Sequence, residues 1–305
     1  MDNSTSIMQY RFEQVDVFTN TRFAGNPLAV FTDVANLMPE TMQLIAREMN
    51  LSETTFVLPA TRSDCVARYR IFTPGQELPF AGHPTLGTAY VLVRSGRAPA
   101  GATSFKMEAE VGAVPVRIEG PSSDPSALFF TSPEVRFGPK YDDRTGIAGA
   151  LNVTEDDLLP GAPLEQAGCP VMHLNVGLKT PQLVDQVVLN SPLLSRLVGD
   201  TSSDGVYLFA EMDKPNQFYA RLLCYENVGI VEDPATGSAA SPLGAYLVRH
   251  GLVGAKDDVE ISINQGVKMG RPSLLTVLVK RVGPAVQRIE VGGSVVPVLK
   301  GELTV

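Results

Sequence analysis

The chain has 305 residues, of which 44% are hydrophobic and 19% are charged, and its formal net charge at pH 7 is −8. This composition is typical of a globular protein of about two domains with a large core. The acidic balance argues against a nucleic-acid partner, because phosphate binding needs a basic surface, and no run of about 18 apolar residues is present that could span a membrane.

The cysteines and the N-terminus add two expectations about location and metals. Cys65, Cys169 and Cys224 match neither a CxxC pair nor a zinc-binding spacing. Residues 1–10 are polar and contain no apolar signal core. We therefore expect no metal site, reduced thiols and a cytoplasmic location.

The first part of the chain predicts several strands and two helices. Pro39 starts a helix in which Met42, Ile45 and Met49 follow helical spacing. A second helix, at about 83–95, is apolar almost all round, which predicts that it is buried on every side. Apolar or alternating runs predict strands at 14–19, 28–31, 52–58, 66–72 and 111–119, the last of them broken by Pro115.

The second part repeats this pattern after a candidate linker at 120–126, which is rich in proline, serine and aspartate. A mostly apolar helix is predicted at about 238–250, with Pro242 near its first turn, where a missing N–H is tolerated. Strands are predicted at 206–211, 218–224, 259–263, 274–280 and in the valine-rich C-terminal segment. Each half is therefore expected to be a set of strands around one buried central helix, and not a doubly wound sheet.

Two stretches share one pattern at a constant separation of 155 residues. Residues 77–83 precede the first apolar helix and residues 232–238 precede the second, with Gly82 and Gly237 in equivalent positions. Such a repeat predicts a duplicated half-domain. Helix N-termini carry unpaired N–H groups and a positive dipole, so two related by pseudo-symmetry are expected to hold one small carboxylate from both sides.

Glu53 and His83 are the first candidates for chemistry. Glu53 lies where a helical turn gives way to a strand, and burial between the halves would raise its pKa and suit it to proton transfer. Spacing alone favours the simpler interpretation, a solvated glutamate at a strand edge. His83 falls at a helix N-terminus, which keeps imidazole neutral and able to hydrogen bond to a substrate; a capping or packed histidine is the alternative.

Asp233 and Ser238 lie at the second repeated turn, and Ser238 is the counterpart of His83. Asp233 is suited to orient an amine or hydroxyl group or to tune Glu53. An ordinary turn aspartate and an ordinary N-cap serine are the alternatives. A turn role explains Asn26 in Gly25-Asn26-Pro27, and Arg271 is expected at the surface or facing a substrate.

At these residues the sequence resembles the PhzF family, the phenazine-biosynthesis isomerases and their relatives, within the diaminopimelate-epimerase fold. The resemblance covers nearly the whole chain. It rests on five ordered motifs: 25–30, 45–53, 70–84, 232–238 and 265–273.

The resemblance implies an α+β fold of two pseudo-symmetric halves, each a mixed, mostly antiparallel sheet wrapped around a buried central helix, with a cleft between them. The first half is expected at 1–122 and the second at 123–288, with a C-terminal strand at about 289–305 returning to the first. The resemblance also implies a homodimer, no cofactor and a small anionic cyclic substrate.

The family's functional residues fall on named positions of this chain. Its acid/base glutamate falls on Glu53, which makes Glu53, His83 and Asp233 the expected catalytic residues. The expected substrate-binding residues are Ser52, Gly82, Gly237 and Ser238.

Two departures from related sequences bear on the chemistry. Related amino-acid epimerases carry a cysteine just before each glycine, where this chain has Ala81 and Thr236. Neither can act as a base, which excludes two-thiol epimerisation and leaves Glu53 as the titratable group. Before the second turn, residues 221–226 replace the Arg-x-Phe-x-Pro pattern seen at 70–74, and Glu226 would be unfavourable near an anion site if it faced inward.

The expected function is isomerisation of trans-2,3-dihydro-3-hydroxyanthranilate in phenazine biosynthesis, by same-face proton transfer through Glu53. One alternative is a PhzF-like isomerase or epimerase with a different small carboxylate substrate. The other is a catalytically idle binding protein on the same scaffold, suggested by the altered residues 221–226.

Overall fold

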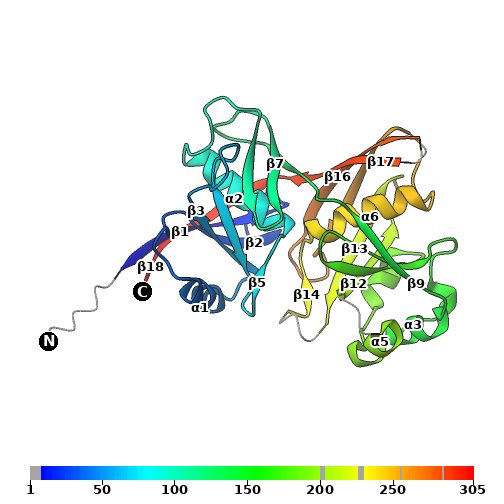
Figure 1. Cartoon of the computed structure of the whole chain (residues 1–305). Helices are drawn as coiled ribbons and strands as arrows, with labels where there is room; N and C mark the ends of the chain where they lie inside the picture. The colour runs from blue at the N-terminus through cyan, green and yellow to red at the C-terminus, as the bar shows by residue number, and fades with distance from the viewer. Residues whose placement is uncertain (1–7, 200–202, 226–229, 255, 284) are drawn as a thin grey trace.

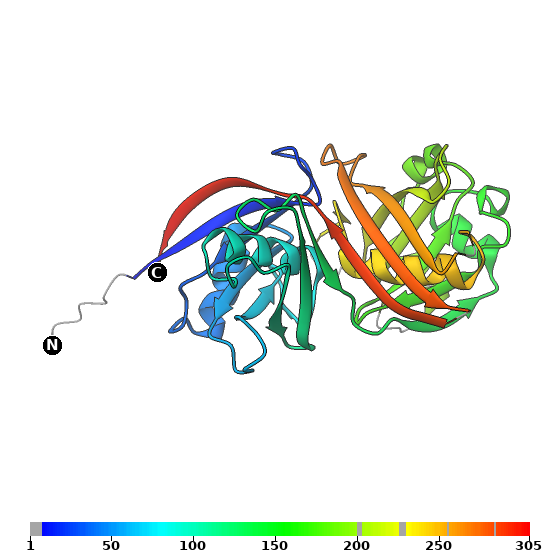
Figure 2. The same cartoon turned by 90° about the horizontal axis from the view of Figure 1, so that it is seen from above.

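The computed structural model describes residues 8–199, 203–225, 230–254, 256–283 and 285–305. They form two halves, each built from strands around one central helix (Figures 1 and 2). The described strands are hydrogen bonded into one continuous sheet of 18 strands. The predicted α+β class with a central helix in each half is confirmed.

The first half contains α2 (Gly82–Arg94) at its centre and α1 (Pro39–Met49) outside the sheet. Its strands are β1 (Gln9–Val17), β2 (Asn26–Phe31), β3 (Glu53–Leu58), β4 (Arg68–Phe72), β5 (Glu77–Leu78), β6 (Ser104–Ala109), β7 (Gly112–Glu119) and β8 (Ala127–Thr131). The C-terminal strand β18 (Val295–Thr304) pairs antiparallel with β1 along its length, which joins the end of the chain to this half.

The second half surrounds α6 (Gly237–Arg249). Its strands are β9 (Arg136–Tyr141), β10 (Leu164–Gly168), β11 (Met172–Gly177), β12 (Ser203–Glu211), β13 (Gln217–Cys224), β14 (Glu232–Asp233), β15 (Asp258–Gln265), β16 (Ser273–Val282) and β17 (Ala285–Gly293). Short helices flank the sheet: α3 (Arg144–Ala150), the 3-10 turn η1 (Glu155–Asp157), α4 (Pro181–Gln186) and α5 (Ser191–Val198).

The two central helices occupy equivalent positions because their sequences are apolar on all sides. Every residue of α2 from Gly82 to Val93 is buried, and so is every residue of α6 from Gly237 to Val248. Each half also repeats two parallel pairings, β2–β3 and β4–β6 in the first and β11–β12 and β13–β15 in the second. The duplication predicted from the 155-residue repeat is therefore present in the topology.

Two local predictions about prolines are wrong, and a third, the linker, stays a prediction. Residues 120–126 form the turn between β7 and β8, and β8 pairs with both β7 and β17 of the second half. Pro115 does not break β7; it lies just beyond the residues that pair with β8, so its missing N–H removes no ladder bond on that side. Pro242 is the sixth residue of α6, inside the helix. The Ser238 carbonyl that it leaves without a helical donor accepts a hydrogen bond from the Cys169 thiol at 3.7 Å.

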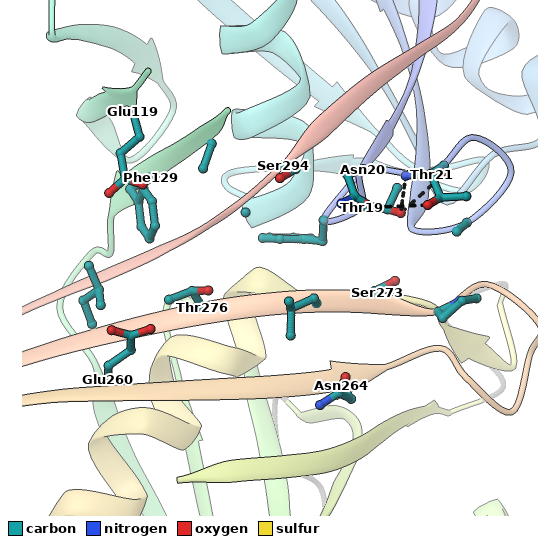
Figure 3. Close-up of a pocket in the computed structure, with 17 residues that line it drawn as sticks. Thr19, Asn20, Thr21, Glu119, Phe129, Glu260, Asn264, Ser273, Thr276 and Ser294 are labelled. Carbon is teal, nitrogen blue, oxygen red and sulfur yellow. Dashed lines mark hydrogen bonds between the residues drawn. The ribbon is translucent and has the colours of Figure 1, made fainter. Parts of the chain in front are cut away.

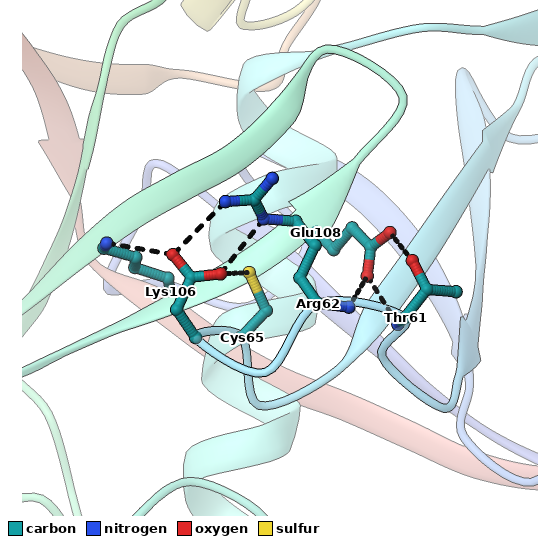
Figure 4. A network of polar contacts seen from close by, with 6 residues as sticks. Thr61, Arg62, Cys65, Lys106 and Glu108 are labelled. Atoms are coloured by element: carbon teal, nitrogen blue, oxygen red, sulfur yellow. Dashed lines mark hydrogen bonds and ion pairs between the residues drawn. The ribbon is translucent and has the colours of Figure 1, made fainter.

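A polar network fixes the loop that precedes β4 (Figure 4). The Glu108 carboxylate accepts hydrogen bonds from the backbone N–H groups of Thr61 and Arg62, at 2.7 and 3.1 Å, and from the Thr61 hydroxyl. Asp64 accepts from Arg62 at 3.0 Å and from Lys106 at 3.1 Å. These exposed ion pairs add little stability individually, but together with Glu108 they hold the loop against β6.

No helix in the described ranges is long and apolar enough to cross a membrane.

Candidate active site

The N-termini of α2 and α6 meet at the centre of the molecule. A Cβ atom added to Gly82 would lie 2.7 Å from the Cα of Gly237, and one added to Gly237 would lie 3.0 Å from the Cα of Gly82. Only glycine allows this approach, because real Cβ atoms do not come so close to backbone. The sequence repeat therefore brings two positive helix ends to one place.

The N–H groups of these helix ends are not consumed by side-chain caps. The N-cap residues are Ala81 and Thr236, and neither makes a side-chain cap hydrogen bond. The Thr236 hydroxyl instead donates to Asp233 at 2.5 Å. Ser238 is the second residue of α6, so the alternative that it is the N-cap is wrong. Both helix ends are thus suited to bind an anion.

Glu53 is the first residue of β3, and its side chain is only 14% exposed. Its Oε2 lies 3.2 Å from Nε2 of His83. Burial raises the pKa of Glu53 well above its usual value, and the negative charge of Asp233 raises it further. The structure therefore places Glu53 in a buried, protonatable position and not at a solvated strand edge.

His83 lies behind Glu53, where burial lowers its pKa to about 3 and keeps the ring neutral. Its Nδ1 is 3.1 Å from the amide nitrogen of Asn26, which can only donate. Nδ1 is therefore the acceptor, and the ring proton is on Nε2, facing Glu53. In this position His83 supports the glutamate.

Asp233 is held by a hydrogen-bond network that spans both halves. Its Oδ1 accepts from Asn26 at 2.9 Å, and its Oδ2 accepts from Thr236. Gln265 donates to the backbone oxygen of Asp233 at 2.8 Å and to the Thr236 hydroxyl at 3.0 Å. Burial raises the pKa of Asp233 to about 6, although hydrogen bonds from Thr236, Asn26 and Ser52 oppose the shift.

A pocket opens beside this network, between the two halves. Four of the predicted site residues line it: Ser52, Glu53, Asp233 and Ser238. The remaining three, Gly82, His83 and Gly237, are buried and are not among its lining residues. Its other lining residues are Thr73, Gln76, Leu78, Phe80, Ala81, Val171, His173, Asp204, Leu222, Cys224, Ile230 and Thr236.

Sequence reasoning missed several members of the site. The sequence predicts only a turn role for Asn26, yet this residue is fully buried and hydrogen bonds to both His83 and Asp233. The position of Asn26 within the first of the five family motifs, at 25–30, is the sequence feature that points to a functional role. His173 and Asp204 belong to no motif or repeat, so nothing in the sequence pointed to them.

Although the segment at 221–226 departs from the pattern at 70–74, its arginine makes the same kind of ion pair as the arginine of the first half. Arg221 forms a two-bond ion pair with Glu232, at 2.9 and 2.8 Å, as Arg70 does with Glu77 at 2.6 Å in both bonds. The replaced residues Leu222 and Cys224 reach the pocket. Glu226 lies outside the described residues.

Arg271 is neither a free surface residue nor part of the pocket lining. It joins the halves by donating to Asp16 at 2.7 Å and to the backbone oxygens of Gly25 and Ala24 at 2.8 and 2.9 Å. Asn26 directly follows this clamped segment. Arg271 therefore positions the loop that carries Asn26.

A second, larger hollow of about 600 Å³ also lies between the halves (Figure 3). Its polar lining includes Glu119, Glu260, Thr276 and Ser294. None of the residues predicted from the sequence lines it, and neither helix N-terminus opens into it.

Among the described residues, no group of three or more histidine, cysteine or acidic side chains could hold a metal ion.

Comparison with known proteins agrees with the geometry. The family model of phenazine biosynthesis-like proteins, PhzC-PhzF, matches residues 15–301. The chain belongs to this family. It is 35% identical over 289 residues to the trans-2,3-dihydro-3-hydroxyanthranilate isomerase of Pseudomonas aeruginosa, covering 93% of this chain and 96% of that one.

Other members of the family extend the comparison. An uncharacterized isomerase of Pasteurella multocida is 33% identical over 304 residues, covering 97% of this chain and 94% of that one. The crystal structure of a PhzF-family protein from Bacillus anthracis superposes with a TM-score of 0.86 at 24% identity, covering 97% and 99% of the two chains. The protein is thus a PhzF-family isomerase, and the predicted family and fold are confirmed.

Proposed function

We propose that this PhzF-family protein is a cofactor-free isomerase of a small cyclic amino-carboxylate, with trans-2,3-dihydro-3-hydroxyanthranilate as the first candidate substrate. The observation that carries the proposal is the position of Glu53. This buried carboxyl group lines a pocket next to two helix N-termini that have no side-chain cap. Its Oε2 lies 3.2 Å from Nε2 of the neutral His83. A substrate carboxylate bound at the helix ends would bring a ring carbon toward Glu53.

The proton transfer follows from these positions. Ionised Glu53 takes the proton from the hydroxyl-bearing ring carbon, and the electron pair of that C–H bond moves into the conjugated ring system. The resulting carboxylic acid returns the proton to the carboxylate-bearing carbon on the same face, which gives an enol that tautomerises to the ketone. The N–H groups at the starts of α2 and α6 stabilise the negative charge that develops on the substrate carboxylate.

The second half supports transfer through one residue. The strand pairings identify the residue of the second half that is equivalent to Glu53. In the first half, Glu53 directly precedes Thr54, Thr54 pairs with Phe72, and Phe72 pairs with Glu77, which belongs to the 155-residue repeat. In the second half Gly205 precedes Val206, Val206 pairs with Leu223, and Leu223 pairs with Glu232. Gly205 is therefore the counterpart of Glu53.

No side chain fits at Gly205, because an added Cβ would lie 2.3 Å from the backbone oxygen of Leu223. The pseudo-symmetric position thus offers no second acid or base. This asymmetry supports removal and return of the proton on one face.

Turnover in D₂O tests the proposal. We expect the ketone product of trans-2,3-dihydro-3-hydroxyanthranilate. NMR should also detect deuterium at the carboxylate-bearing carbon, because the proton carried by Glu53 exchanges with solvent between its removal and its return. Failure with this compound but reaction with another member of a panel of cyclic amino-carboxylates would assign a different substrate to the same site. Binding of such compounds without any exchange would support the idle binding protein instead.

The pH dependence of kcat/KM gives a second test. The base must be ionised, and burial raises the pKa of Glu53 well above its usual value, so we expect activity to fall as the pH drops through a range above that of an ordinary glutamate. The charge of Asp233 raises the pKa of Glu53, so Asp233→Asn should move this acid limb to lower pH.

The matched control is Asp213→Asn, the same change at an exposed position, which should leave the limb in place. If the acid side of the pH profile of kcat/KM stays at the same pH or shifts to higher pH in Asp233→Asn, the carboxyl groups of Asp233 and Glu53 do not interact as described.

A further inference from the structure

The pocket contains a carboxyl group that the proposed reaction does not use. Glu53, Asp204 and Asp233 all line it, and none of the described residues that line it is a lysine or arginine. Oε2 of Glu53 lies 3.2 Å from Nε2 of His83 without a hydrogen bond, and it is the base of the proposed reaction. Both oxygens of Asp233 accept hydrogen bonds, from Asn26 and Thr236. Within the described part of the chain, the side chain of Asp204 has no hydrogen-bond or ion-pair partner.

Backbone geometry accounts for the position of Asp204. In the parallel pair β11–β12, Met172 lies opposite Ser203 but His173 lies opposite Gly205, so Asp204 is an extra residue at a bulge. A bulge redirects a side chain that would otherwise follow the strand's alternation. The same bulge places Asp204 next to the pairing position of His173, and both residues line the pocket.

His173 adds an unsatisfied polar atom to the lining of the pocket. Its side chain is 4% exposed, and its Nδ1 has no hydrogen-bond partner among the described residues. Burial lowers the pKa of His173 to about 4, so the ring is neutral at pH 7. A buried polar atom without a partner is costly unless a ligand supplies one.

Charge indicates what that ligand group is. The two helix ends can hold a carboxylate, but the other side chains that line the pocket in the described ranges are acidic or neutral. A plain carboxylate would bring its negative charge beside carboxyl groups without compensation, whereas an ammonium group at Asp204 would balance it. Asp204 is available for this contact because Asp233 already accepts hydrogen bonds at both oxygens.

We propose that Asp204, assisted by His173, binds the ammonium group of the substrate and makes the pocket selective for amino acids over plain carboxylates. This inference rests on the proposed function for the place of the substrate carboxylate. It adds a specificity-determining residue on β12, whereas the proposed carboxylate site lies at the starts of α2 and α6.

Binding of two stable probes tests the inference without any turnover. 2-Aminocyclohexanecarboxylate, as separate cis and trans isomers, and cyclohexanecarboxylate differ only in the ammonium group, and calorimetry gives a Kd for each. For at least one isomer we expect the wild-type protein to bind the amino acid at least tenfold more tightly. Asp204→Asn should remove most of this ratio while leaving the affinity for cyclohexanecarboxylate unchanged or higher. His173→Gln should reduce the ratio by a smaller factor.

Asp213→Asn serves as the matched control at an exposed site, and thermal unfolding checks that each variant is folded. Asp204→Ser provides a second, smaller replacement should the asparagine variant fail to fold. The inference is overturned if the wild-type protein shows no preference, if neither probe binds at millimolar concentration, or if Asp204→Asn weakens both probes equally. A preserved preference with no isomerase activity would instead overturn the proposed function and leave the ammonium site standing.

Discussion

Glu53→Gln is expected to lower turnover of the cyclic amino-carboxylate by about a thousandfold, the range that a positioned acid or base supplies. Glutamine has nearly the same shape, so its amide group can occupy the place of the carboxyl group beside Nε2 of His83. The pocket and the helix ends therefore stay in place, and only the group that carries the proton is lost. The loss should appear in kcat and in deuterium incorporation alike.

The same variant should be more stable than the wild-type protein at alkaline pH. The folded protein raises the pKa of Glu53, so this residue contributes stability at low pH that is lost as the pH rises through its folded pKa. Glutamine removes that loss, and we expect a higher Tm at pH 8. A gain in stability together with a loss of activity is characteristic of a residue kept in an unfavourable environment for function.

Glu48→Gln is the matched control, because it makes the same chemical change on the exposed face of α1. It should alter neither turnover nor the pH dependence of Tm. Undiminished deuterium incorporation in Glu53→Gln would remove Glu53 from the mechanism, whatever happens to Tm.

The parts of the fold that the sequence predicts are those set by local patterns. The helices α2 and α6 were predictable because their residues are apolar on every face and a glycine-containing turn precedes each one. The 155-residue repeat likewise predicted that Gly82 and Gly237 are equivalent. Their direct contact could not be predicted, because it depends on how the two halves pack.

The site was less predictable for the same reason. Asn26 follows a glycine and precedes a proline, which suits an ordinary turn, and only tertiary structure brings it to His83 and Asp233. Asp204 reaches the pocket through a bulge that the pattern of β12 does not reveal. Pro242 lies inside α6, where the Ser238 carbonyl that it leaves without a helical donor accepts a hydrogen bond from Cys169 in another part of the chain. The homodimer and the cytoplasmic location stay predictions.

The contact between the helix ends leads to the second large effect, which is expected for Gly82→Ala. Its new Cβ would lie 2.7 Å from the Cα of Gly237 and 3.1 Å from Cε1 of Phe130. The first neighbour is backbone and cannot rotate away, so one helix must shift. We expect the free energy of unfolding to fall by about 3 kcal/mol, at the upper end of overpacking costs, as measured by denaturant titration.

Activity should fall further than stability alone requires, because separating the helix ends widens the site for the substrate carboxylate. KM should rise as well as kcat fall, since the carboxylate is held in both the ground state and the transition state. Gly237→Ala should have the same effect from the other side. Because each added methyl group meets the other residue's backbone, the two changes should not be additive in the double variant.

Gly149→Ala is the matched control for these variants. Gly149 lies in α3 with no atom within 4 Å of an added Cβ, so alanine should leave stability unchanged or raise it slightly. Normal stability and a normal KM in Gly82→Ala would mean that the helix ends do not meet as described, and the carboxylate site would then lose its structural basis. A loss confined to the Gly82 and Gly237 variants would instead show that the duplicated glycines are retained for the close approach that creates the anion site.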